Sequence, residues 1–378
     1  MDNAYFWWKS ITGPRMIVSG VLNAVSDGRA AVFRVPSDLP WRRVMRGVIQ
    51  EEYQQRMENP DVIVDALDMV DDDPNDMEPG RFLLDRFASR EVKAGYREKM
   101  QASIQEYICK HEVLRNRVIW LKALSGKKAA GWIEFCRKYP KMSAKTGLFV
   151  LEVHGIIQDI SGIENLKLID FDEIVSSWDV QLFDNVLLDT EGRYSDTWKN
   201  YASAVSSSLC GTDAEVSAEL IKDTDFLNDD ILMRLRGVSN KDQFQRRGSE
   251  PGSPNVLRYV REGNEVELKH RLWKAQVQVL FPLIEIERLN IIDAYREDIQ
   301  SALENYYVKQ YHEQIADPDD VELGTLCWMM RRWNDNGHVL EISDEDVRKR
   351  INFIHECRNK LAHASCCSPE EVKQLLGA

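Results

Sequence analysis

The sequence has no long apolar run, no N-terminal segment with the pattern of a secretory signal, and no positive net charge. No stretch of about 18 uninterrupted apolar residues occurs in the 378 residues, which excludes a membrane-spanning helix of the usual kind. A secretory signal has a basic stretch followed by an apolar one. The N-terminal segment 1–9 is aromatic but lacks this pattern. The formal net charge is −13, from 62 acidic and 49 basic residues, and this disfavours unspecific adhesion to nucleic acid or to an anionic membrane. We therefore expect a cytoplasmic protein without a membrane partner, in which any nucleic-acid site is a local basic patch.

Cysteine is also scarce and irregularly placed. The chain has 7 cysteines, an odd number without the spacing of a disulfide framework, which is typical of a reducing compartment. Hydrophobic residues make up 43% and charged residues 29% of the chain, an ordinary composition for a folded protein. The length exceeds that at which a single hydrophobic core usually stops growing. The composition thus predicts a folded chain of two or three domains.

Residues 1–236 alternate short apolar runs with longer helical patterns. This alternation predicts an α/β region with a mainly parallel sheet, because helical stretches of this length can connect parallel strands. The expected strands are Ala30–Val35, Val62–Ala66, Val118–Leu121, Leu148–Val153 and Leu168–Phe171. The expected helices between them are Arg15–Val25, Trp41–Gln55, Phe82–His111 and Lys128–Lys138.

No phosphate-binding loop is present in this region. The segment after the first expected strand, Pro36–Trp41, has neither the glycines that let backbone amides approach phosphate nor a lysine to reach it. The segment Ser125–Lys128 opens an expected helix, but the first glycine of a Walker A loop is missing. Residues 1–236 weakly resemble a degenerate P-loop or AAA-type module, and the resemblance implies that nucleotide chemistry has been lost. We expect a sensor or regulatory region, or a scaffold that docks a partner, and neither NTP turnover nor a bound cofactor.

A polar segment separates this region from a helical one. Residues 237–256 are rich in Gly, Pro, Ser and Asn and have no apolar period, which predicts a linker. Residues 257–378 show only helical patterns and predict an all-α helical bundle. Its first helix is expected over about Glu265–Tyr311, kinked or divided by Pro282.

The last long helix, expected from about Asp344 to His363, has one apolar and one polar stripe. The apolar stripe contains Val347, Ile351, Ile354 and Leu361, and we place Arg358 at its missing position. A buried arginine is costly unless it is paired or works at an interface. The polar stripe contains Asn352, His355, Asn359 and His363, at spacings of three and four.

The end of this helix carries a motif. The string Arg358–His363, RNKLAH, matches the R-N-x-x-x-H signature of the HEPN superfamily (higher eukaryotes and prokaryotes nucleotide-binding domains), which residues 257–378 therefore resemble. The resemblance implies a metal-independent endoribonuclease that acts as a dimer, with Arg358, Asn359 and His363 as the catalytic residues. It implies that His363 is the general acid or base, that Arg358 holds the phosphate and that Asn359 orients the site. It also implies a role in a prokaryotic antiviral defence or toxin system.

The residue types agree with RNA cleavage. Imidazole can accept and donate a proton near neutral pH, and guanidinium binds phosphate bidentately. Arg358 and His363 are five residues apart, about 140° around one helix, so a single tight site needs a second chain or a frayed helix end. The neighbouring cations Arg348, Lys349, Arg350 and Lys360 are the expected RNA-binding residues.

Two other interpretations remain open. A HEPN-like fold without catalysis would make the protein a dimerising adaptor that docks a partner ATPase or defence complex. A zinc site could draw on ligands grouped near the C-terminus, namely His355, Cys357, His363, Cys366 and Cys367. These residues do not repeat a paired C-x-x-C spacing, so we expect no metal.

Overall fold

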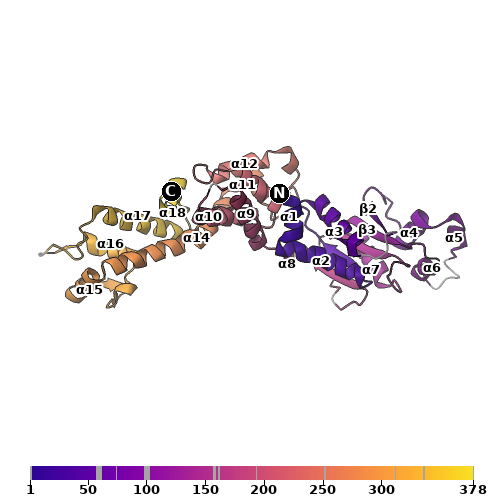
Figure 1. The fold of residues 1–378 in the computed structure, drawn as a ribbon, viewed down its shortest axis with the longest axis horizontal. Helices are drawn as coiled ribbons and strands as arrows, with labels where there is room; N and C mark the ends of the chain where they lie inside the picture. Colours follow the sequence, from indigo (N-terminus) through magenta and orange to yellow (C-terminus); the bar gives the residue numbers. More distant parts are fainter. Residues whose placement is uncertain are drawn as a thin grey trace. The chain divides into compact units, whose positions relative to one another are not determined.

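The computed structural model describes residues 2–56, 62–73, 75–97, 103–155, 159–160, 162–192, 194–250, 253–310, 312–334 and 337–377. It divides into two compact units (Figure 1). Unit 1 comprises Met1–Phe183 with Thr212–Glu215, and unit 2 comprises Asp184–Gly211 with Val216–Ala378. Helix α9 (Ser177–Glu191) contributes to both units.

Unit 1 is built on a five-stranded parallel sheet with the strand order β2-β3-β4-β1-β5. The strands are β1 (Ala30–Arg34), β2 (Ile63–Asp68), β3 (Arg117–Ser125), β4 (Leu148–His154) and β5 (Leu166–Asp170). Each coincides with a run that the sequence predicts to be a strand, so the predicted α/β fold is confirmed. Strand β4 is buried along almost its whole length, which is why it reads as a continuous apolar run.

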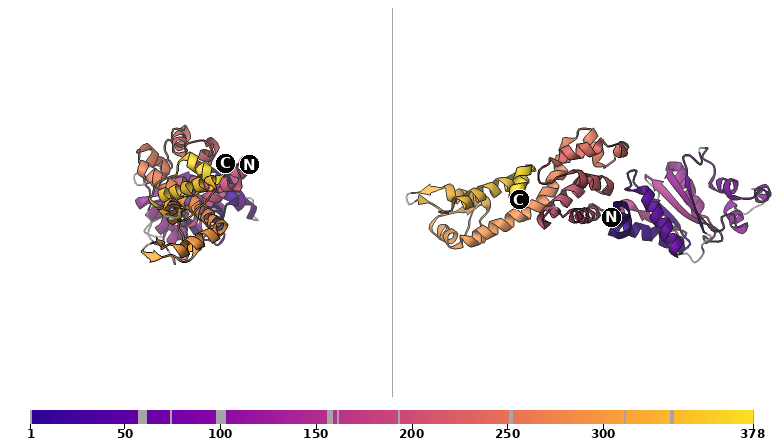
Figure 2. Two further views of the ribbon diagram at one scale, coloured as in Figure 1. Left: turned by 90° about the vertical axis from the view of Figure 1, so that its left-hand side faces the viewer. Right: turned by 45° about the horizontal axis from the view of Figure 1, so that its top comes forward.

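Helices cover both faces of this sheet (Figure 2). The helices of unit 1 are α1 (Asn3–Ser10), α2 (Thr12–Ser26), α3 (Arg42–Arg56), α4 (Pro79–Phe87), α5 (Arg90–Gly95), α6 (Ile104–Lys110), α7 (Gly126–Arg137) and α8 (Phe171–Ile174). Helices α2 and α3 pack on the face that contains Trp120 and Val150. Phe149 points to the other face, where its ring meets Phe135 of α7 at 6.1 Å. This alternation along β4 places the hydrophobic core of unit 1 in two layers.

One predicted helix of unit 1 is divided in the structure. The helix expected over Phe82–His111 is replaced by α4, α5 and α6, and residues 98–102 of that range lie outside the described residues. The predicted helix is interrupted where serine residues cap the start of a new helix. The Ser89 hydroxyl caps α5 and the Ser103 hydroxyl caps α6, each accepting from a backbone N–H three residues on. Serine favours such helix starts over helix interiors.

In its described residues, unit 2 is built of helices together with two hairpins of two-residue strands. Its helices are α10 (Asp196–Cys210), α11 (Ala214–Asp223), α12 (Ile231–Ser239), α13 (Val256–Arg261), α14 (Glu265–Ala294), α15 (Arg296–Asn305), α16 (Leu323–Arg331), α17 (Glu345–Ala362) and α18 (Pro369–Leu376), with short 3₁₀ turns at Asp242–Phe244 and Pro318–Asp320. The hairpins pair β6 (Lys309–Gln310) with β7 (Glu313–Gln314), and β8 (Trp333–Asn334) with β9 (Gly337–His338). The predicted helical C-terminal region is confirmed, with these hairpins as a small addition.

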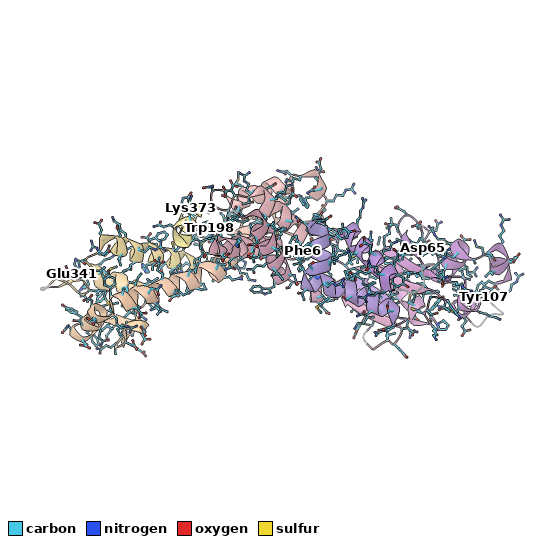
Figure 3. The ribbon with its side chains drawn as sticks, viewed as in Figure 1. Phe6, Asp65, Tyr107, Trp198, Glu341 and Lys373 are labelled. Atoms are coloured by element: carbon cyan, nitrogen blue, oxygen red, sulfur yellow. The ribbon has the colours of Figure 1, made fainter. Side chains whose placement is uncertain are left out.

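Helix α14 is the long helix on which other helices of unit 2 pack. It packs against α10, α17 and α18, and α10 contributes the buried Trp198 (Figure 3). Of the kink or division predicted at Pro282, a division does not occur, because α14 runs through this proline. The predicted helix is divided at Tyr295, between α14 and α15.

The predicted linker, residues 237–256, is packed rather than extended where it is described; residues 251–252 lie outside the described residues. It begins inside α12, its Phe244 is fully buried, and the Arg261 guanidinium donates to the Phe244 carbonyl at 2.8 Å. Helix α10 packs on α14, so residues from Asp184 on, apart from Thr212–Glu215, belong to the same compact unit as the C-terminal helices, and the division of the chain lies before the predicted linker.

A fully buried carboxyl group lies in the core of unit 2. The Ser217 hydroxyl donates to Oδ2 of Asp184 at 2.6 Å and lies 2.7 Å from the Ser206 hydroxyl. Oδ1 of Asp184 is buried and has no hydrogen-bond partner among the residues that the structure describes. Burial raises the pKa of Asp184 well above its ordinary value of 3.8, and the serine hydrogen bonds oppose this only in part.

This raised pKa predicts a pH-dependent stability. At pH below 3.8 the carboxyl is protonated in both the folded and the unfolded chain. As the pH rises, the unfolded chain ionises first, so the free energy of unfolding of unit 2 falls. In Asp184→Asn the side chain cannot ionise. We expect the variant to gain stability over the wild type as the pH rises from about 4 to 7, measured by urea unfolding. A difference that does not change with pH would contradict a raised pKa.

Among the described residues, no helix combines the length and the apolarity needed to span a bilayer.

Candidate active site on helix α17

Helix α17 carries the predicted motif, and its start follows from local capping. The Asp344 carboxylate accepts from the backbone N–H groups of Asp346 and Val347, at 2.9 and 3.2 Å. Glu345 and Asp346 lie in the first turn, where the helix dipole favours negative charge. The helix therefore begins at Glu345, close to the predicted start.

The buried stripe of α17 differs from the predicted one at the motif. Ile351, Ile354, Cys357 and Leu361 are buried, so the missing apolar position is filled by Cys357 and not by Arg358. A thiol behaves as a small hydrophobe in a core. Arg358 lies next to the stripe with its side chain 29% exposed. Because the guanidinium keeps contact with solvent, the free-energy cost of burying an arginine does not apply.

His363 ends the helix and faces solvent. It is the C-cap residue of α17, and its backbone N–H donates to the Asn359 carbonyl at 3.0 Å. The next residue, Ala364, has a φ of 55°, so the chain turns sharply in the left-handed region. The His363 side chain is exposed and is free to meet a ligand or a second chain.

The turn after His363 is anchored to α14. The Gln276 side chain, 1% exposed, accepts from the Cys367 backbone N–H at 2.7 Å and donates to its carbonyl at 3.1 Å. The Trp273 indole N–H donates to the Leu361 carbonyl at 2.7 Å. These bonds fix the end of α17, and with it the position of His363.

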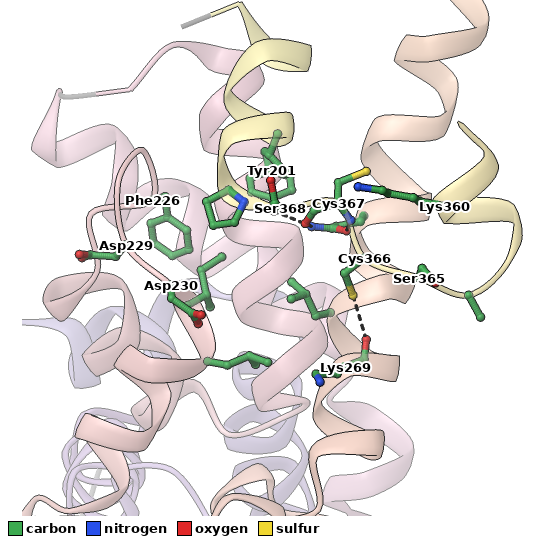
Figure 4. A pocket seen from close by; sticks show the side chains of 17 residues that line it. Tyr201, Phe226, Asp229, Asp230, Lys269, Lys360, Ser365, Cys366, Cys367 and Ser368 are labelled. Carbon is green, nitrogen blue, oxygen red and sulfur yellow. Dashed lines mark hydrogen bonds between the residues drawn. The ribbon is translucent and has the colours of Figure 1, made fainter. Parts of the chain in front are cut away.

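A pocket of about 490 Å³ lies beside this turn (Figure 4). Residues 364–369 form one wall, and Phe226, Ile231 and Leu272 contribute apolar side chains. The Cys366 thiol donates to the Lys269 carbonyl at 3.4 Å. Lys360 lines the pocket, but the side chains of Arg358, Asn359 and His363 do not. The pocket therefore supports the turn without being the predicted active site.

Arg358 points toward α16 at the edge of an acidic groove. Its guanidinium lies 3.7 Å from the Glu322 carboxylate. The groove has a volume of about 790 Å³, and six carboxylates line it with only two arginines; the charged lining residues are Glu285, Glu313, Asp317, Asp319, Asp320, Glu322, Arg288 and Arg358. Such a groove repels phosphate, so its charge does not favour an anionic ligand on this side of Arg358.

The polar stripe is tied together by hydrogen bonds. The side-chain amide nitrogen of Asn359 lies 3.0 Å from Nε2 of His355, and the Arg331 guanidinium donates to the side-chain oxygen Oδ1 of Asn352 at 2.5 Å. Burial above all, then the nearby charges of Arg331 and Arg358, lowers the pKa of His355 from 6.5. Its imidazole is therefore neutral at pH 7 and can accept the Asn359 hydrogen bond.

The four predicted RNA-binding cations have partners within the chain. Arg350 binds Glu287 through two hydrogen bonds of 2.5 and 2.8 Å, and Lys360 lies 2.5 Å from Glu371. Arg348 donates to the carbonyls of Ile342 and Ser343. Lys349 pairs with Glu345 at 2.7 Å, but its side chain is 68% exposed. Their role in RNA binding stays a prediction, and Lys349 is the one whose partner is easiest to displace.

Two of the three cysteines near the motif are hydrogen-bonded to each other in the core. Cys357 and Cys367 are buried, and a hydrogen bond between their thiols raises the pKa of Cys367 far above its ordinary value and lowers that of Cys357. The third cysteine, Cys366, lines the pocket beside the turn after His363. Within the described parts of the chain, no three His, Cys, Asp or Glu side chains are grouped as metal ligands.

The motif residues thus point in three directions. Arg358 meets Glu322, Asn359 meets His355, and His363 faces solvent at the helix end. The sequence singled out His355 only as a member of a stripe, although it is the partner of Asn359. Its spacing of four from Asn359 was the available signal.

No model of a known protein family matches the chain, and comparison with curated proteins gives no match either.

Proposed function

We propose that unit 2 carries a metal-independent endoribonuclease that acts as a homodimer in the cytoplasm. One observation carries the proposal: an exposed imidazole, His363, ends the same helix that holds Arg358 and Asn359 one turn earlier. An exposed histidine at a fixed helix end can exchange protons with a substrate, and a guanidinium nearby can bind its phosphate. The resemblance to HEPN proteins supports the same conclusion.

The proposed reaction is an intramolecular transesterification, in which a ribose 2′-hydroxyl of the RNA attacks the adjacent phosphate. His363 removes the proton from a ribose 2′-hydroxyl, and the 2′-oxygen attacks the adjacent phosphorus. The bond from phosphorus to the 5′-oxygen breaks, and that oxygen takes a proton from an imidazolium, so that a 2′,3′-cyclic phosphate and a 5′-hydroxyl result. Arg358 stabilises the charge on the phosphate. Asn359, through its bond to His355, keeps the polar stripe in place.

The directions of the side chains support a dimer. On a regular helix Arg358 and His363 would diverge by about 140°, and the Arg358 guanidinium lies beside Glu322 while His363 faces solvent at the C-cap, so we propose that one chain alone does not aim both at one phosphate. In a symmetric dimer each cleft receives the arginine of one chain and the histidine of the other. Binding of RNA then replaces the contact of Arg358 with Glu322 by a contact with phosphate.

Unit 1 is the proposed sensor or regulatory region, with a defence or toxin role for the whole chain. A specific observation also favours the adaptor as a second candidate function. On α9, Trp178 and Leu182 are 66% and 51% exposed and lie one turn apart, which is typical of a surface that binds another protein. An adaptor would bind a partner through unit 1 and leave RNA intact.

The test is cleavage without metal. We expect the purified chain to cut single-stranded RNA in excess EDTA and to leave 2′,3′-cyclic phosphate ends, detected by mass spectrometry of the fragments. His363→Ala protein purified in parallel reveals any contaminating ribonuclease. Intact RNA in EDTA, with cleavage restored by Mg²⁺, would contradict the mechanism, and intact RNA in both conditions would favour the adaptor.

A further inference from the structure

Helix α16 presents one exposed face beside the polar stripe of α17. Gly324, Trp328 and Arg331 are exposed and follow each other at spacings of four and three, so they lie on one face. The remaining residues of the helix are mostly buried, including Leu326, Cys327, Met329 and Met330. The exposed face therefore contains one large aromatic side chain and one cation, and no residue of Leu323–Arg331 is acidic.

Two contacts show where this face lies. A Cβ atom on Gly324 would be 3.4 Å from Nε2 of His355, and Arg331 binds Asn352 at 2.5 Å. His355 and Asn352 both belong to the polar stripe of α17. Trp328 is between Gly324 and Arg331 in the helix, so its indole, 44% exposed, flanks the same stripe.

We propose that this face of α16 binds one nucleotide of single-stranded RNA, with the base stacked on Trp328 and the phosphate held by Arg331. The inference rests on the proposed function and names the form of its substrate. An exposed indole stacks on any base, because every base has a flat π-face. In a duplex the bases are already stacked and the deep groove hides their edges, so Trp328 distinguishes single strands from duplexes.

The surroundings of Trp328 favour RNA over another protein as the ligand. Arg331 supplies positive charge on the same face. Burial, followed by the charges of Arg331 and Arg358, lowers the pKa of the His355 imidazole and outweighs the opposing effect of Glu356. His355 and Asn359 add neutral hydrogen-bonding groups. A guanidinium, an indole and uncharged polar groups on one surface are the combination that single-stranded nucleic acid requires.

Binding can be measured apart from cleavage with a fluorescein-labelled 2′-O-methyl RNA of about ten nucleotides, which covers one such site and cannot be cut because its 2′-hydroxyls are blocked. Fluorescence anisotropy gives the dissociation constant. We expect Trp328→Ala to weaken binding about tenfold, equivalent to about 1.4 kcal/mol. Trp328→Phe should retain most of the affinity. Trp178→Ala removes a still more exposed tryptophan, 66% against 44% for Trp328, from unit 1 and is the matched control, expected to bind as the wild type does.

An oligonucleotide with abasic sites should bind wild type and Trp328→Ala equally, because no base remains to stack. Equal binding of the normal probe by both proteins would overturn the inference. The outcomes of the two proposals are distinct. Tight binding that depends on Trp328, together with no cleavage of unmodified RNA, would contradict the proposed function and leave this binding surface standing.

Discussion

Heterodimers of Arg358→Ala and His363→Ala chains are expected to cut RNA at about half the rate of the wild-type dimer, although each variant alone is inactive. Each single substitution should lower cleavage at least about a hundredfold, because it removes the phosphate-binding or the proton-transfer group from both clefts. In the heterodimer one cleft receives both altered residues. The other cleft receives the intact arginine of one chain and the intact histidine of its partner, so one of the two sites works.

Two affinity tags, one on each variant, allow the heterodimer to be isolated after co-expression, and its rate is measured on a fluorogenic RNA in EDTA. Lys222→Ala is the matched control in unit 2, because this cation is 72% exposed, pairs with Glu219 within α11 and has no part in the proposed site. Its heterodimer with the wild type should keep the full rate. An inactive heterodimer would show that each site draws on one chain alone, and a chain that forms no dimer would contradict the shared cleft altogether.

Most of the α/β fold could be predicted from the sequence, for a physical reason. Strands of a parallel sheet are buried on both faces, so their apolar runs are continuous and easily found. The run Leu148–Val153, for example, becomes β4 almost residue for residue. The helix expected over Phe82–His111 was divided because serine caps at Ser89 and Ser103 start new helices, which apolar periodicity does not register.

The site was less accessible to sequence reasoning, because its geometry depends on contacts between distant segments. Periodicity found the polar stripe, but it assigned Arg358 to the buried face that Cys357 occupies. The Glu322 partner of Arg358 comes from the start of α16. Gln276, which anchors the turn after His363, is 91 residues away in the sequence. No local pattern reveals such pairs.

Unit 1 offers a test of how its fold is held together. Glu152 on β4 is fully buried, and the Arg46 guanidinium of α3 binds it through hydrogen bonds of 2.7 and 2.6 Å. The Trp120 indole N–H donates to the same carboxylate at 2.8 Å. The two partners satisfy a charge that the core could not otherwise tolerate, because an unpaired buried carboxylate loses its hydration without compensation.

We expect Arg46→Met to lower the free energy of unfolding of unit 1 by about 3–5 kcal/mol, which corresponds to a fall in Tm of about 10 °C. Differential scanning calorimetry of the full chain measures this, since the transition of unit 2 is an internal reference. Arg46→Met with Glu152→Gln should recover at least half of the loss, because the amide keeps an acceptor for Trp120 and buries no charge. The matched control is Lys9→Met, whose pair with Glu51 is 3.0 Å long but exposed on both sides and should contribute less than about 1 kcal/mol. If Arg46→Met and Lys9→Met cost the same, the ion pair on β4 is not what stabilises the sheet, and the packing of α3 against Trp120 must carry that role instead.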